Sequence, residues 1–135
     1  MNEILVPLAA ADLIDRIVVL QLQIETAVHG QQDGRIIRQK KILDRLASRV
    51  LPDDPDLHRM QRNLYNARCD LLAIEEDLRA CDERAEFGVP FVALTRAFLA
   101  SRDALDHVMT ELRDHLTKPL LLNEEYAGIH GSRDA

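Results

Sequence analysis

The chain has 135 residues, of which 47% are hydrophobic and 30% charged, a balance typical of globular proteins. It has no Trp, three Phe and two Tyr, so its core must be aliphatic, which suits packed helices better than a β-sandwich. The formal net charge of −6 argues against nucleic acid as a partner, because contact with phosphates needs a basic face. No apolar run reaches the roughly 20 residues that span a bilayer, and we expect no secretion signal.

The beginning of the chain predicts an extended segment followed by a buried helix. Pro7 disfavours helix in residues 3–8, "EILVPL". Residues 11–25, "ADLIDRIVVLQLQIE", then carry apolar side chains at helical spacing on nearly every side. The alternation within "VLQLQI" leaves a strand as the alternative, although the segment is long for one. We predict a helix here, the most buried of the molecule.

Three segments rich in turn-forming residues, 29–34, 51–55 and 87–90, separate four predicted helices. The second helix, residues 33–51, has one apolar face and a basic flank. The third begins after Asp54, a suitable cap, and Gly88 offers a stop. Its apolar residues are spaced 3 and 4 apart over about seven turns: Leu57, Met60, Leu64, Ala67, Leu71, Ile74, Leu78 and Cys81.

The fourth predicted helix repeats this heptad spacing, and Leu116 supports its weak end. The seam positions are Phe91, Leu94, Phe98, Ser101, Leu105, Val108, Leu112 and His115. The short "FGVP" connection makes the two long helices antiparallel. We therefore predict an all-α fold, a four-helix antiparallel bundle built around a long coiled-coil-like hairpin. Residues 1–117 would form a single domain, and 118–135 a docked or partly disordered tail. The long hairpin and the apolar first helix predict exposed apolar surface in a monomer. We therefore expect a homodimer or higher oligomer with two-fold symmetry.

The two cysteines indicate the compartment. Cys69 and Cys81 are twelve residues apart on one predicted helix. That separation is roughly 18 Å along the axis, too far for a disulfide. We expect reduced cysteines and a cytoplasmic protein.

Several short motifs resemble an uncharacterised bacterial family of all-helical domains. They are "ILVP" (4–7), "LIDR" (13–16), "LLAIEEDLR" (71–79), "FVALTR" (91–96) and "NEEYA" (123–127). The resemblance covers nearly the whole chain and implies a bacterial helical domain, but no assigned activity. The chain departs from the family pattern at Ala9, Ala11, Leu72 and Arg102, where the family has Ser, Gly, Trp and Asn.

Seven charged residues within or beside these motifs form a candidate ligand site: Asp15, Arg16, Glu75, Glu76, Arg79, Arg96 and Asp103. Arginines and carboxylates between helices can bind an anionic small molecule or serve as a general acid and base. The same pattern is typical of ion pairs that fix helix register. We favour the ion pairs and keep the ligand site as the alternative.

Two patterns of acidic residues are candidates for metal sites. Glu83 and Glu86, with Glu111 and Asp114, are similar to the paired motifs of all-α, Mg²⁺-dependent nucleotide pyrophosphohydrolases, but lie far apart along the hairpin. The stripe Asp103, His107, Glu111 and His115 offers metal ligands on a mostly solvated face. We predict no metal and no cofactor.

Gly-rich phosphate loops and hydrolase nucleophile motifs are absent from the sequence. We therefore predict a self-associating helical protein-interaction module, a scaffold or adaptor, that also docks a partner protein. The alternative is a small all-α enzyme or a binder of anionic small molecules that uses the seven charged residues.

Overall fold

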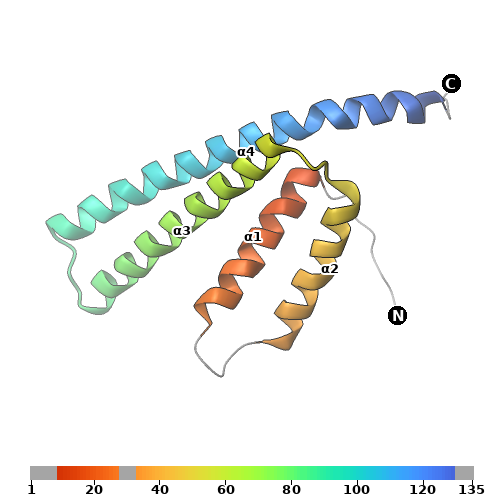
Figure 1. The fold of residues 1–135 in the computed structure, drawn as a ribbon. Helices are drawn as coiled ribbons and strands as arrows, with labels where there is room; N and C mark the ends of the chain where they lie inside the picture. Colours follow the sequence, from red (N-terminus) through yellow and green to blue (C-terminus); the bar gives the residue numbers. More distant parts are fainter. Residues whose placement is uncertain (1–8, 28–32, 130–135) are drawn as a thin grey trace.

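The computed structural model describes residues 9–27 and 33–129, with side chains up to residue 117. The predicted extended segment at 3–8 lies outside the described residues. All regular secondary structure in the described part is helical, which confirms the all-α, four-helix prediction (Figure 1). The helices are α1 (Ala10–Thr26), α2 (Gly34–Val50), α3 (Pro55–Glu83) and α4 (Val89–Ile129).

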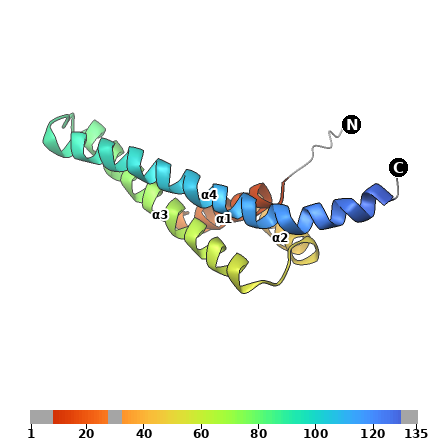
Figure 2. The same cartoon turned by 90° about the horizontal axis from the view of Figure 1, so that it is seen from above.

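The helices α3 and α4 form a long antiparallel hairpin, which has the most extensive interhelical contact in the molecule (Figures 1 and 2). The predicted heptad seam of α3 faces α4. Its buried members are Leu57, Leu64, Leu71 and Cys81, and those of α4 are Leu105, Met109, Leu112 and Leu116. Of these, Met109 lies outside the predicted seam and belongs to the core that α1 shares with α3 and α4.

Helix α1 lies between the hairpin and α2 (Figure 1). Ala11, Ile14, Val18 and Leu22 share a core with buried residues of α3 and α4. Leu20 is fully buried but belongs to the opposite side of α1, where α2 packs. Burial on two sides explains the apolar character of α1. The prediction that α1 is the most buried helix is confirmed, and the strand alternative is wrong.

The ends of α3 show one correct and one incorrect prediction. Asp54 caps the first turn by accepting a hydrogen bond from the Asp56 backbone N–H at 2.9 Å. The predicted stop at Gly88 is wrong, because α3 ends at Glu83. Ala85 adopts a left-handed conformation, with φ of 56°, and its N–H bonds to the Asp82 carbonyl. The Glu86 N–H bonds to the Cys81 carbonyl, which completes a Schellman motif.

The backbone of α4 remains helical to Ile129, across the expected domain boundary at residue 118. Its last turns extend past the beginning of α3 (Figures 1 and 2). The expected docking of 118–135 concerns side chains outside those that the structure describes.

The two ends of the hairpin differ in their surroundings. Helices α1 and α2 pack near the beginning of α3, whereas the end that carries the turn extends away from them (Figures 1 and 2). We call residues 76–104 the hairpin arm. In the described part of the chain, no helix is both long and apolar enough to cross a membrane.

Candidate functional site

The Asp15 side chain forms an ion pair with a residue that the sequence analysis did not select. Arg68 on α3 donates two hydrogen bonds to it, from Nε at 2.9 Å and from Nη2 at 2.7 Å. Both side chains are largely buried, with 21% of Asp15 and 27% of Arg68 exposed. The pair joins α1 to α3 and satisfies both oxygens of the carboxylate. The sequence feature that could have indicated Arg68 is its position directly after the seam residue Ala67, at the edge of the apolar face of the helix.

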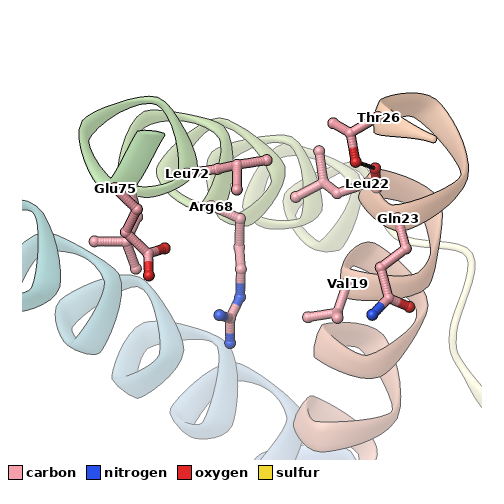
Figure 3. A pocket seen from close by; sticks show the side chains of 8 residues that line it. Val19, Leu22, Gln23, Thr26, Arg68, Leu72 and Glu75 are labelled. Atoms are coloured by element: carbon pink, nitrogen blue, oxygen red, sulfur yellow. Dashed lines mark hydrogen bonds between the residues drawn. The ribbon is translucent and has the colours of Figure 1, made fainter. Parts of the chain in front are cut away.

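Glu75 lies near this pair, at the rim of a small pocket between α1 and α3 (Figure 3). The pocket has a volume of about 170 Å³ and is lined mostly by apolar atoms, including those of Val19, Leu22 and Leu72. The side chains of Arg68 and Glu75 both point into it (Figure 3). The guanidinium of Arg68 is already bound to Asp15, which leaves it fewer free donors for an anionic ligand.

Of the seven predicted site residues, Glu75 alone lines this pocket. Arg16, Glu76, Arg79, Arg96 and Asp103 are exposed on α1, α3 and α4. Within residues 9–27 and 33–117, no ion pair joins any two of the seven predicted residues. The structure therefore places Glu75 on the same pocket as Arg68 and leaves the remaining five charges at the surface.

A second polar contact to α1 comes from Tyr65. Its hydroxyl donates a hydrogen bond to Glu25 at 2.5 Å, and Gln21 donates a second one at 2.6 Å. The two hydrogen bonds lower the pKa of the Glu25 carboxyl, and the bond from Tyr65 has the larger effect. The same bond raises the pKa of the Tyr65 hydroxyl. The contact fastens the end of α1 to α3.

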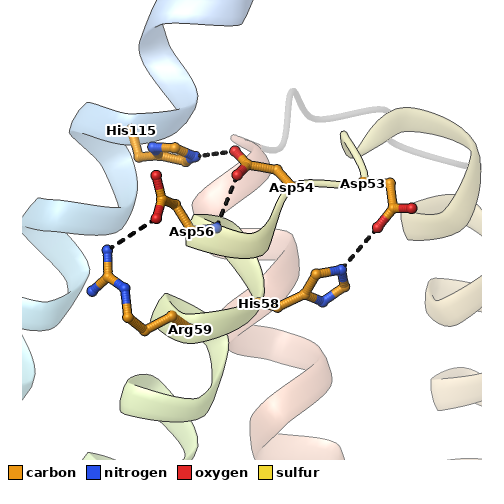
Figure 4. Close-up of polar contacts among 6 residues, drawn as sticks. All are labelled: Asp53, Asp54, Asp56, His58, Arg59 and His115. Atoms are coloured by element: carbon orange, nitrogen blue, oxygen red, sulfur yellow. Dashed lines mark hydrogen bonds and ion pairs between the residues drawn. The ribbon is translucent and has the colours of Figure 1, made fainter.

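A third contact joins the beginning of α3 to α4 (Figure 4). His115 Nε2 donates a hydrogen bond to Asp54 Oδ2 at 2.5 Å, and both side chains are mostly buried. This bond, more than the capping bond from Asp56, lowers the pKa of the Asp54 carboxyl. From the sequence alone, Asp54 is predicted only as a helix cap, and His115 only as a seam position and possible metal ligand. A histidine in an apolar seam was the signal that a polar partner lies opposite.

The predicted metal patterns are dispersed in the structure. His115 turns to Asp54, whereas His107 lies on the exposed side of α4, 3.9 Å from Glu111. Glu86 lies past the end of α3, where it contacts Arg84. Among the residues whose positions are described, no group of three or more potential ligands lies together.

The hairpin arm carries most of the exposed large apolar side chains of the described chain. Val89 is 82% exposed and Leu99 is 59% exposed, and Phe87 and Val92 are about half exposed. At the turn, Phe87 packs edge-to-face against Phe91, with 5.4 Å between ring centroids. Helices α1 and α2 leave this surface uncovered.

Comparisons of the chain with protein families, with curated proteins and with solved structures found no match. Function is therefore inferred from side-chain chemistry. In the Asp15–Arg68 pair and in the Asp54–His115 pair, each side chain has its polar partner within the protein. The exposed apolar side chains of the arm instead face solvent.

Proposed function

We propose that this protein is a self-associating helical interaction module and that the hairpin arm is the surface at which two copies meet. The observation that supports this is the exposed apolar group on the arm: Phe87, Val89, Val92 and Leu99. Exposed large apolar side chains that gather on one part of a globular protein commonly mark a binding site. The arm also extends from the bundle, so another chain can lie along it without displacing α1 or α2.

The seven-residue ligand site remains the alternative, with less support. An anionic ligand needs arginines that converge and are free to donate. Arg68 already donates two hydrogen bonds to Asp15, and Arg16, Arg79 and Arg96 are exposed on three different helices. This arrangement favours the interaction module over a small all-α enzyme.

We also propose that the protein is cytoplasmic and belongs to the bacterial helical family that its motifs resemble. Both cysteines are free thiols, which accords with a reducing compartment. The family has no assigned activity, so it adds nothing to the choice between the two functions. Docking of a further, different protein is part of the proposed scaffold role.

Sedimentation equilibrium of the full chain over a wide concentration range tests the proposal. We expect a reversible monomer–dimer equilibrium. Leu99→Asp places a carboxylate in the proposed contact surface and should weaken dimerisation about tenfold or more, because burying the charge is costly. The matched control is Ile42→Asp on α2, since Ile42 is 58% exposed and Leu99 is 59% exposed.

The two variants separate a specific surface from general hydrophobicity. The control should dimerise as the unmodified chain does, and circular dichroism should show both variants folded. A chain that remains monomeric at the highest concentration would refute self-association. Equal weakening by both substitutions would show that the arm is not the contact surface.

A further inference from the structure

The outer face of α4 carries a second regular stripe along the hairpin arm. Val92, Arg96, Leu99 and Asp103 are spaced 4, 3 and 4 residues apart, so they lie on one side of the helix. All four are exposed. The predicted seam residues Leu94 and Leu105 lie on the opposite side of the helix, and Leu105 is part of the core shared with α3. The outer stripe therefore has heptad spacing but no helix packed against it in the described chain.

The two charges of this stripe have opposite sign and no partner of their own. Arg96 and Asp103 make no ion pair with any side chain in the described part of the protein. They are separated by about 10 Å along the axis, so they do not reach each other. Both side chains are therefore available to an incoming chain.

The positions of these charges are complementary under a two-fold rotation. If two α4 helices pair antiparallel about an axis between Leu99 and Ala100, Arg96 of each copy lies opposite Asp103 of the other. The axis lies midway between the two charges in the sequence, so both ion pairs form at once. A parallel pairing in register would instead place Arg96 against Arg96 and Asp103 against Asp103, which is unfavourable.

The same register also places the apolar residues. Leu99 of the two copies meet beside the axis, and Val92 lies opposite His107, whose side chain is exposed in the single chain. Val89, the most exposed large apolar residue, reaches the level of Thr110 on the other copy. The paired region then spans residues 89–110 and leaves the packing of α1 against the hairpin unchanged.

We infer that a second copy of this chain binds the outer face of α4 in antiparallel orientation, with reciprocal Arg96–Asp103 ion pairs on either side of Leu99. This inference rests on the proposed function and adds the orientation and register of the dimer. The contact is isologous, as in most homodimers, because the same surface serves both copies.

Charge reversal tests the register directly. Arg96→Glu alone places two carboxylates opposite each other at both ends of the contact, and Asp103→Arg alone places two guanidinium groups there. Each variant should self-associate roughly tenfold more weakly than the unmodified chain. An equimolar mixture of the two variants restores opposite charges at both positions and should form a heterodimer of nearly unmodified affinity.

The measurement is sedimentation equilibrium of each variant and of their mixture, with one variant labelled so that the heterodimer is distinguished. Arg62→Glu is the matched control, since Arg62 is an exposed arginine on α3, outside the arm. It makes the same change in net charge and should leave dimerisation unchanged.

The outcomes separate this inference from the proposed function. An unmodified chain that stays monomeric overturns both. If the unmodified chain dimerises but the mixture associates no more tightly than the separate variants, the antiparallel register is wrong and self-association stands. Weakening by Arg62→Glu equal to that by Arg96→Glu would show an effect of net charge, and would also overturn the Arg96–Asp103 pairing.

Discussion

At the scale of single residues, Ala85 has the least favourable backbone conformation that the structure describes. It has the only positive φ of a non-glycine residue in the described chain, and its N–H donates a hydrogen bond within the turn that ends α3. A left-handed conformation brings Cβ close to a carbonyl oxygen, which costs roughly 1–2 kcal/mol. The sequence pattern pointed to Gly88 because glycine usually occupies this position.

Ala85→Gly should therefore stabilise the protein. Relief of strain at φ 56° outweighs the greater flexibility of glycine in the unfolded chain, so we expect about 0.5–1 kcal/mol more stability. Urea denaturation measures the free energy of unfolding. Ala73→Gly, at an exposed position within α3, is the control and should lose about 0.5–1 kcal/mol. A loss at both positions would contradict the assignment of strain to Ala85.

At the scale of helices, the Asp15–Arg68 pair fixes how α1 lies on α3. Arg68→Met should cost about 1–3 kcal/mol of stability, because it leaves the mostly buried Asp15 carboxylate without its two hydrogen bonds. The double substitution Asp15→Leu with Arg68→Met should cost less than the sum of the single ones, since no charge then remains unpaired.

Arg79→Met is the control for this prediction, because Arg79 is an exposed arginine on the same helix. Its effect should stay within about 0.5 kcal/mol in the same urea denaturation assay. If Arg68→Met and Arg79→Met lower the free energy of unfolding equally, the Asp15–Arg68 ion pair does not stabilise the contact between α1 and α3. An additive double substitution would mean that Asp15 and Arg68 are not coupled.

The sequence predicts the apolar faces of the helices better than it predicts the polar contacts between them. Heptad spacing indicates which side of α3 and of α4 is apolar, because that information is local to each helix. The partner of Asp15 depends on how α1 lies against α3, which no local pattern contains. Arg68 was therefore missed, although Asp15 itself was selected. Arg79 and Arg96 share motifs with residues of the predicted seams, yet their positions on the helix direct them to solvent.

At the scale of the whole molecule, the hairpin has a fastened end and a free end. Near the beginning of α3, its core is shared with α1, and the Asp54–His115 bond joins α3 to α4. At the other end, the arm is held by the α3–α4 seam alone among the described elements (Figure 1). Overall stability should therefore depend on polar contacts at the fastened end, whereas self-association depends on the arm.

Acid should weaken the fastened end through Asp54. Its carboxyl has a lowered pKa in the folded protein, below the ordinary value of 3.8, chiefly because His115 donates a hydrogen bond to it. A group whose pKa is lowered by folding stabilises the protein above its unfolded pKa. That contribution is lost as the pH falls from about 3.8 through the lower pKa of the folded state.

Asp54→Asn tests this, because asparagine also caps helices but carries no carboxyl charge. The unmodified chain should be more stable than the variant at pH 7, and the difference should shrink as the pH is lowered below 3.8. Urea denaturation at a series of pH values measures both. In a His115→Gln background the pH-dependent part of the difference should be smaller, since the main cause of the lowered pKa is removed. A difference that is constant with pH would show that the Asp54–His115 bond does not favour the charged carboxylate.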